Sequence, residues 1–276
     1  MKLTVLVENT SAREGVKAAH GLSLLIETAA HTILFDFGPD GEMLRGNAAA
    51  LGADLKRVDI AVLSHGHNDH SGGLAAFLED NDKAKLYVHR RAVLSHYANA
   101  GGGYNDISAD KALLETYADR VVWTEGVYDI GETLTLFSDA ALDMPLFATN
   151  RTLFELRDGE YVTDGFEHEQ DLLIREDGKI SLIGGCAHRG IVNIVGRAAA
   201  IEGKAPDAVF AGFHLNNPGL KEDEPAETVA EVGRRLKSLP CRYFTGHCTG
   251  AGPFELLKGA LDERIAYMGG GGVFEI

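Results

Sequence analysis

Residues 65–70, with the sequence HGHNDH, constrain the fold and the chemistry of this chain more than any other segment. They contain three imidazoles and one carboxylate, side chains whose nitrogen and oxygen atoms suit zinc. The apolar run at 59–63 predicts a strand directly before them, and residues 74–78 predict a helix shortly after. A loop this rich in metal-binding side chains at the end of a strand predicts a metal centre.

The spacing within the loop indicates how it would bind metal. His65 and His67 are two residues apart, so an extended segment points both the same way. Asp69 and His70 then face a neighbouring position, and one loop can supply two adjacent ions. The alternative is a polar loop that caps a helix, for which Asp69 or Ser71 alone would suffice. Three histidines in six residues favour the metal centre.

Short apolar runs alternate with turn signals along the chain, which predicts an α/β fold of layered sheets and helices. The predicted strands are 3–7, 22–27, 32–36, 59–63, 85–89, 121–124, 134–137, 152–156, 171–175, 180–183, 208–211, 242–245 and 273–276. The predicted helices are 41–51, 74–78, 191–201, 225–236 and 254–260. We expect a single domain over 1–276, with a helical insertion or lid at about 90–118 that the glycines at 101–103 make mobile.

Charge, cysteine content and hydropathy limit which classes of partner and which cellular location we expect. The formal net charge is -15, and so acidic a surface repels phosphate backbones; we expect a small-molecule substrate and no nucleic acid. A bound cation would reverse the field locally, so an anionic small substrate stays open. Three cysteines suggest no disulfide framework and a cytoplasmic location. No apolar run is long enough to cross a membrane, the start lacks a signal-peptide core, and a homo-oligomer stays open.

The HGHNDH run resembles the HxHxDH signature of the metallo-β-lactamase superfamily. Further phrases look like the branch related to 7,8-dihydropterin-6-ylmethyl-4-(β-D-ribofuranosyl)aminobenzene 5'-phosphate synthase: HGLSLLIET (20–28), ILFDFG (33–38), GGCAHRGIVNI (184–194), AGFHL (211–215) and GHCTG (246–250). The resemblance spans nearly the whole chain and is weakest at 90–150. It implies an αββα four-layer sandwich, in which two mixed sheets are flanked by helices.

The resemblance also implies ligands beyond the loop. His247 would complete a second metal position with Asp69 and His70, although a structural histidine is the alternative. His188 would complete the first position with His65 and His67. Cys186 is its rival, because thiolate binds zinc well, whereas a small buried thiol is the more frequent fate.

One departure from the superfamily bears on metal number. The aspartate that usually bridges two ions is not evident, and Gly184-Gly185-Cys186 stands in about its place. One ion or two therefore stay open.

Four other polar residues complete the expected site. The resemblance makes Asp36 the group that holds a histidine ligand in its correct tautomer; a turn carboxylate is the alternative. His20 and His214 are expected either to line the pocket or to be ordinary histidines. His168 lies in the charged run EHEQD and is expected to be solvated.

His67 bears on the reaction, because the flavo-di-iron branch has glutamate there. Histidine favours zinc and hydrolysis, although manganese or iron stay open. We expect a hydrolase that attacks a small, phosphorylated or pterin-like substrate through a metal-bound hydroxide oriented by the catalytic Asp69. The alternatives are a pterin-condensing transferase, since the synthase of that branch displaces pyrophosphate from an activated pterin, and a non-catalytic metal-binding or sensing protein.

Overall fold

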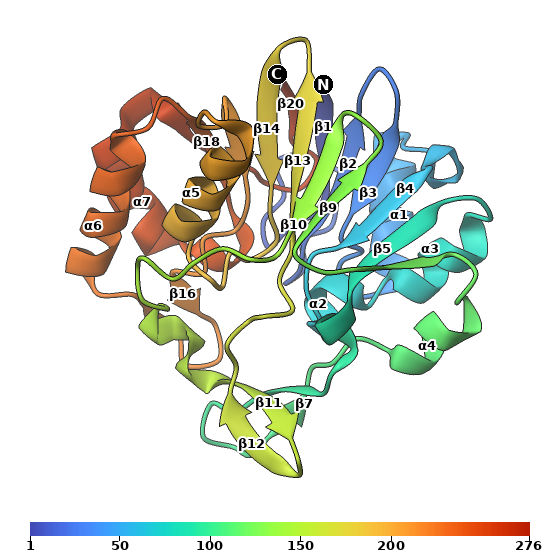
Figure 1. Ribbon diagram of the computed structural model, residues 1–276, viewed down its shortest axis with the longest axis horizontal. Coiled ribbons are helices and arrows are strands. Elements are labelled where there is room, and N and C mark those ends of the chain that lie inside the picture. The colour runs from blue at the N-terminus through green and yellow to red at the C-terminus, as the bar shows by residue number, and fades with distance from the viewer. The chain divides into compact units, whose positions relative to one another are not determined.

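The computed structural model describes residues 1–276 and divides them into two compact units, each treated below by itself (Figure 1). The first unit comprises Met1–Ser95, Ile107–Glu125 and Met268–Ile276. The second comprises His96–Asp106 and Gly126–Tyr267. Both units are therefore discontinuous in sequence. The single domain expected over 1–276 stays a prediction.

The first unit is built on a mixed seven-stranded sheet. Its spatial order is β20 (Val273–Glu275), β1 (Lys2–Val7), β2 (Ser23–Glu27), β3 (Thr32–Phe35), β4 (Ile60–Leu63), β5 (Lys85–His89) and β8 (Val121–Thr124). Pairing is antiparallel from β20 to β3 and parallel from β3 to β8. All four residues of β4 are buried, as expected for a strand in the interior of a parallel sheet.

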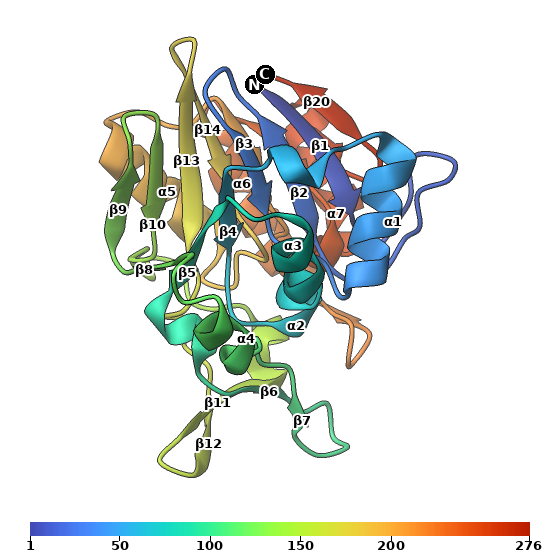
Figure 2. The same ribbon diagram turned by 90° about the vertical axis from the view of Figure 1, so that its right-hand side faces the viewer.

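Two helices of the first unit, α1 (Gly41–Leu51) and α3 (Leu74–Asp80), pack against each other and against this sheet (Figure 2). The start of α1 is capped by Asp40, whose side chain accepts a hydrogen bond from the backbone of Met43 at 2.8 Å. The remaining helical segments are η1 (Leu55–Arg57), α2 (Asn68–Ser71), η2 (Arg90–Val93) and α4 (Lys111–Thr116).

The second unit contains another mixed seven-stranded sheet, in the order β19 (Ile265–Tyr267), β18 (Arg242–Thr245), β15 (Ala208–Phe210), β14 (Lys179–Ile183), β13 (Asp171–Glu176), β10 (Leu134–Phe137) and β9 (Val127–Ile130). Two smaller sheets belong to it, β12 (Glu160–Thr163)–β11 (Leu153–Arg157)–β6 (His96–Ala98)–β7 (Asn105–Asp106) and β16 (Asn216–Asn217)–β17 (Glu222–Asp223). The α/β class predicted from the sequence is confirmed in both units.

The helices of the second unit are α5 (Ile191–Glu202), α6 (Ala226–Lys237) and α7 (Ala251–Leu261), with shorter turns η3 (Ala148–Thr152), η4 (His247–Thr249) and η5 (Asp262–Arg264). Helix α6 follows Pro225 and buries Val229, Val232 and Leu236, as its sequence pattern predicts. These side chains join one apolar cluster with residues of α5, α7 and the sheet strands.

The segment at 90–118 differs from its prediction. Its two ends are helical, as η2 and α4, but its middle forms the strands β6 and β7. The prediction of helix is therefore wrong for the middle. The glycines at 101–103 connect these two strands, and two of them have positive φ (101° at Gly101, 108° at Gly103), which explains why glycine is needed there. The lid role stays a prediction.

No helix combines the length and the apolar character needed to cross a membrane.

A buried arginine ties the parallel half of the first sheet to α3. Arg120 is 8% exposed. It donates to the carbonyl oxygens of Ala84 and Leu78, both at 3.1 Å, and to that of Asn81. Burial lowers its pKa, although Asp119 acts in the opposite direction. One guanidinium thus donates hydrogen bonds to three buried backbone carbonyl oxygens.

Replacing Arg120→Met should leave these carbonyls without donors and lower the free energy of unfolding by about 3 kcal/mol. Urea denaturation followed by circular dichroism measures the change. The exposed Arg90→Met is the matched control and should change it by less than about 0.5 kcal/mol. Equal stability of the two variants would contradict the anchoring role.

Candidate metal centre

The HGHNDH loop of the first unit leaves the end of β4 and continues into α2. His67 is extended, with φ -90° and ψ 145°, and its carbonyl accepts from the backbone N–H groups of His70 and Ser71 at 3.1 Å each. The other side of the loop is held by residues 107–109: Asn68 donates to Ile107 at 2.8 Å and Ala109 to Gly66 at 2.9 Å. The loop is thus fixed by backbone hydrogen bonds on both sides.

The loop brings the four predicted ligands of this segment together. His65, His67 and His70 are buried, and the ring centroid of His65 lies 4.5 Å from that of His67 and 4.2 Å from that of His70. The carboxylate of Asp69 approaches Nε2 of His70 at 3.5 Å. Three imidazoles and one carboxylate therefore share one small region.

Asp36 organises this region, although it lies 34 residues from His70. Its Oδ2 accepts from Nδ1 of His70 and from Oγ of Ser64, both at 2.7 Å, and its Oδ1 accepts from the Ser64 backbone at 2.7 Å. All three residues are fully buried. Such a carboxylate holds the His70 proton on Nδ1, which leaves Nε2 as the atom with a lone pair.

Ser64 fixes the tautomer of His65 in the same way. The Ser64 hydroxyl gives its one proton to Asp36, so Oγ must accept from Nδ1 of His65, which lies at 2.7 Å. Both histidines are thereby fixed as the tautomer that metal-binding histidines adopt. The donor set fits a zinc-type ion.

His20 contacts the remaining carboxylate of the loop. Its Nε2 lies 3.3 Å from Oδ2 of Asp69, and its Nδ1 lies 3.2 Å from the Asn9 amide. Because the amide nitrogen can only donate, Nδ1 accepts and Nε2 carries the proton toward Asp69. The His20 side chain is 47% exposed, so this contact lies at the open side of the loop.

The second unit gathers the other predicted residues. Near the end of β14, ligand-type atoms of Cys186, His188 and His214 lie within 4.8 Å of one another. Those of Cys186, His247 and Cys248 do the same. All five side chains are buried. Cys186 and His188 therefore belong to one cluster, and the choice between them as ligand stays open.

His188 is held by several neighbours. Its Nδ1 lies 2.9 Å from Oδ1 of Asn150, and its backbone donates to Glu169 at 2.7 Å. Its ring stacks on Phe166 with centroids 4.4 Å apart and lies 4.1 Å from the ring of His214. Burial raises the pKa of Glu169 to about 7, against the backbone N–H groups that favour its ionised form. His188 is thus fixed on its Nδ1 side.

Cys248 is a site residue that the sequence analysis missed. Burial raises the pKa of its thiol, but contact with Cys186 and the charges of His247 and His214 outweigh burial and hold it well below its usual value. A low pKa favours the thiolate, the form that binds metals. Its position directly after His247 was the available signal.

The expectation that His168 is solvated is wrong. Its side chain is 1% exposed and contacts Asp164 and His96. The signal that could have corrected it, the proximity of His96, comes from residues 72 positions away and is not visible in a local pattern.

Comparisons with known proteins place the chain in a family. The sequence family described as the metallo-beta-lactamase superfamily matches residues 17–174. That is more than half of the chain. The chain belongs to the metallo-β-lactamase superfamily. The predicted family and fold class are therefore confirmed, and the matched range includes the HGHNDH loop.

One curated relative is named 7,8-dihydropterin-6-methyl-4-(beta-D-ribofuranosyl)-aminobenzene-5'-phosphate synthase, from Methanocaldococcus jannaschii. It is 29% identical over 248 residues, covering 84% of this chain and 81% of the relative. Among solved structures of the superfamily, Tm1679, titled a metal-dependent hydrolase, matches with a TM-score of 0.83, 26% identity and coverage of 100% and 99%. Zn(2+)-bound PqqB from Methylobacterium extorquens shares the fold, with a TM-score of 0.62, 14% identity and full coverage of both chains.

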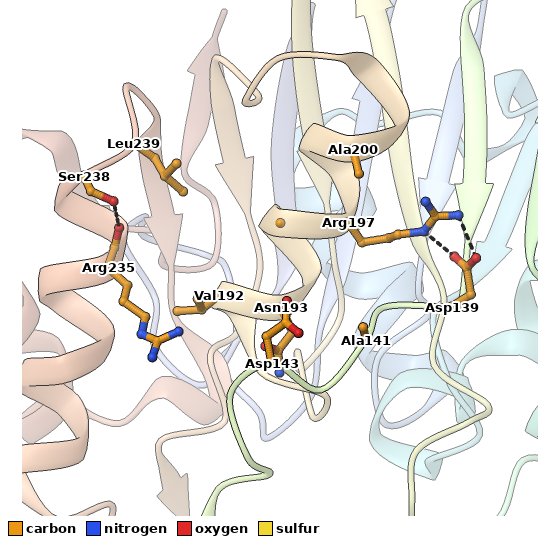
Figure 3. Close-up of a pocket in the computed structure, with 11 residues that line it drawn as sticks. Asp139, Ala141, Asp143, Val192, Asn193, Arg197, Ala200, Arg235, Ser238 and Leu239 are labelled. Carbon is orange, nitrogen blue, oxygen red and sulfur yellow. Dashed lines mark hydrogen bonds and ion pairs between the residues drawn. The ribbon is translucent and has the colours of Figure 1, made fainter.

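One hollow of the second unit is lined by none of the predicted site residues. It has a volume of about 710 Å³ and is lined by α5, the end of α6 and residues 139–143 (Figure 3). Its arginines are already neutralised: Arg197 pairs with Asp139 at 2.7 Å, and Arg235 with Glu231 at 2.6 Å. This hollow therefore offers no unpaired arginine to an anion.

Two glycines behind the HGHNDH loop are needed for space. A Cβ on Gly72 would lie 1.9 Å from the carbonyl oxygen of Pro39, and one on Gly73 would lie 2.2 Å from that of Phe37. Neither glycine has positive φ, so close backbone approach, and not conformational freedom, requires them here. The loop can lie against residues 37–40 only without a side chain.

Replacing Gly72→Ala should push the loop away from Pro39 and lower the free energy of unfolding by about 3 kcal/mol. Gly46→Ala is the matched control, because Gly46 lies inside α1 with open space around its Cα. It should instead stabilise the chain by up to about 1 kcal/mol. Urea denaturation of both variants measures the difference, and a neutral Gly72→Ala would refute the packing argument.

Replacing Asp36→Asn should weaken zinc binding about 10- to 100-fold, because the amide no longer enforces the His70 tautomer. Competition with a chromogenic chelator measures the affinity. Asp59→Asn is the control, since Asp59 pairs with His31 at the same 2.7 Å but lies outside the loop. Unchanged affinity in Asp36→Asn would remove Asp36 from the metal centre.

Proposed function

We propose that this chain is a metal-dependent hydrolase whose substrate is small and either phosphorylated or pterin-like. The observation that carries the proposal is the HGHNDH loop, in which His65 and His70 are fixed by Ser64 and Asp36 in the metal-binding tautomer. Hydrogen bonds of this kind to Nδ1 orient metal-binding histidines. The superfamily is one that uses metal ions, and the loop is its signature.

Each residue of the loop has a distinct proposed role. His65, His67, Asp69 and His70 hold one metal ion or two, which we take to be zinc because imidazoles and carboxylates suit it and His67 is not glutamate. A bound zinc supplies Lewis-acid polarisation and an activated water at neutral pH. Asp69 orients the attacking group and passes its proton, and His20, at 3.3 Å, fixes the direction of that carboxylate.

His188 and His247 are proposed as further ligands on sequence grounds. What supports His188 is its Nδ1 contact with Asn150 at 2.9 Å, which directs the other nitrogen toward a ligand role. What supports His247 is its position in the cluster with Cys186 and Cys248. Cys186 remains the alternative to His188 as a ligand. Whether one ion or two bind also stays open.

Charge and relatives support the substrate class. The net charge of -15 disfavours a polynucleotide, whereas a bound cation admits a small anion. The 29% identical relative is named for a product that contains both a pterin and a phosphate. Three buried free cysteines support a cytoplasmic setting.

That same relative also favours a second candidate, a transferase that condenses a pterin with an aminobenzene phosphate, because its name is that of a synthase. The two candidates differ in their acceptor. A hydrolase delivers water, and a transferase delivers an amine or a ring carbon. Both would use the same loop, so only the product distinguishes them.

The deciding experiment is a substrate panel on zinc-loaded protein. Phosphodiester, pyrophosphate, thioester and lactone substrates are assayed alone, and an activated dihydropterin is assayed with and without an aminobenzene ribofuranosyl phosphate acceptor. The hydrolase predicts turnover of a phosphorylated substrate without any acceptor. A condensed product that forms only with the acceptor present would establish the transferase in its place.

His65→Ala and His67→Ala should each abolish turnover together with bound zinc, as elemental analysis and the same assay show. His31→Ala is the control and should retain both, because His31 lies outside the loop and contacts only Asp59 and the turn before β3. Full turnover in both loop variants would refute the proposed centre. No metal in any preparation of the wild type would refute it as well.

A further inference from the structure

Three residues of the second unit meet around one carboxylate oxygen. Oδ2 of Asp164 lies 3.0 Å from Nδ1 of His96 and 3.1 Å from Nε2 of His168. The two imidazole rings are tilted by 34°, with centroids 3.9 Å apart. None of these residues belongs to the HGHNDH loop or to the motifs that identify the superfamily. They form a cluster that the proposed function leaves unexplained.

The smaller sheet brings the three residues together. His96 begins β6 and pairs with Glu155 of β11. Asp164 follows β12, and its backbone donates to Leu153 at the start of β11. The chain then turns at Phe166, whose φ is 54° and whose backbone donates to Oδ1 of Asp164 at 2.7 Å. That turn returns His168 to the same carboxylate and leaves Oδ2 for the two imidazoles.

The surroundings of the cluster are closed to water. His96 and Asp164 are at most 1% exposed, and so is His168. Burial raises the pKa of Asp164, but the two histidines outweigh it and hold that pKa well below its usual value, so the carboxylate is ionised. Burial also lowers the pKa of His168, although the Asp164 carboxylate opposes it.

The charges near the cluster also bear on ion binding. The other buried carboxylate nearby, Glu155, is matched by the guanidinium of Arg157 through two bonds of 2.9 Å. Asp164 itself contacts two histidines and a backbone N–H, and it also interacts electrostatically with Arg157. An ionised carboxylate in a dry interior is costly unless a cation compensates it.

We propose that His96, Asp164 and His168 bind a divalent first-row transition-metal ion of the zinc type. Two imidazoles and one carboxylate are a donor set of zinc and of ferrous iron, and three protein ligands leave a fourth position open. Bonds of 2.0–2.2 Å to a tetrahedral zinc place neighbouring ligand atoms about 3.3 Å apart. The observed 3.0 and 3.1 Å need only small adjustments to reach that separation.

A hydrogen-bonded histidine–aspartate pair elsewhere in the chain shows the contrast. His31 and Asp59 lie 2.7 Å apart, but the pair has a single imidazole and both side chains are partly exposed. Water can compensate such a pair, so it needs no ion. The cluster at Asp164 differs, because two imidazoles contact one carboxylate oxygen and all three side chains are buried.

The experiment counts cobalt(II) on the full chain, because cobalt substitutes for zinc and absorbs visible light when its coordination is tetrahedral. The metal-stripped wild type, a variant with two loop histidines replaced (His65→Asn, His70→Asn), His168→Gln and the control His31→Gln are each titrated. Circular dichroism verifies that each is folded.

We expect the loop variant to retain a cobalt ion with tetrahedral absorption. Adding His168→Gln to it should remove that ion, whereas adding His31→Gln should not. A folded loop variant that binds no cobalt, or that keeps its cobalt after His168→Gln, overturns the proposal. Failure of the proposed function has a separate sign, because His65 and His67 would then be dispensable for turnover while this count is unaffected.

A second measurement needs no variant and decides the matter if His168→Gln does not fold. Crystals of the wild type are soaked in zinc, and an anomalous difference map is calculated at the zinc edge. A peak within bonding distance of His96, Asp164 and His168 supports the proposal. A peak at the HGHNDH loop with none at Asp164 overturns it.

Discussion

The carboxylate of Asp36 is the interaction on which the predicted chemistry of the first unit depends. It accepts three hydrogen bonds from two residues, Ser64 and His70, and all three side chains are fully buried. Because Ser64 passes the constraint to His65, one buried charge sets the tautomer of two imidazoles. The strands supply the precision: Asp36 follows β3 and Ser64 follows β4, and these strands are parallel neighbours whose carboxyl ends meet at one edge. The sheet register therefore determines the protonation pattern of the loop.

The sequence predicted the buried elements well and the exposed ones poorly. Strands such as β4 and β14 are apolar because both faces are covered, so they are visible as runs of Val, Ile and Leu. The strands β9 and β12 were missed because most of their residues are exposed and their sequences resemble loops. The middle of the 90–118 segment was mistaken for helix for the related reason that the strands β6 and β7 are short and partly exposed and are defined by pairing with each other and with distant residues. Hydrophobic patterns in the sequence indicate which residues are buried. Strand pairing between exposed residues produces no such pattern, so it cannot be predicted from the local sequence.

The candidate site divides in the same way. HGHNDH was found because its residues are adjacent in sequence, and Asp36 because a family phrase contains it. The cluster of His96, Asp164 and His168 has no such phrase, and the charged neighbours of His168 indicated solvent. Tertiary structure reversed that expectation, because the turn at Phe166 returns His168 to Asp164 in a buried position. Histidines that gather from separate elements can be recognised only once their strands are placed.

The discontinuity of the first unit has a consequence for how the chain is made. β20 pairs antiparallel with β1, joining Lys2 to Glu275 at opposite ends of the sequence. During vectorial synthesis on a ribosome, the outer edge of β1, with the buried side chains Leu3 and Val5, stays without its partner until the last strand emerges. Closing so long a loop carries a large entropic cost and slows the final pairing. A nascent chain of this design exposes a hydrophobic strand edge from the synthesis of β1 until that of β20, the interval in which a chaperone that binds extended apolar segments would protect it.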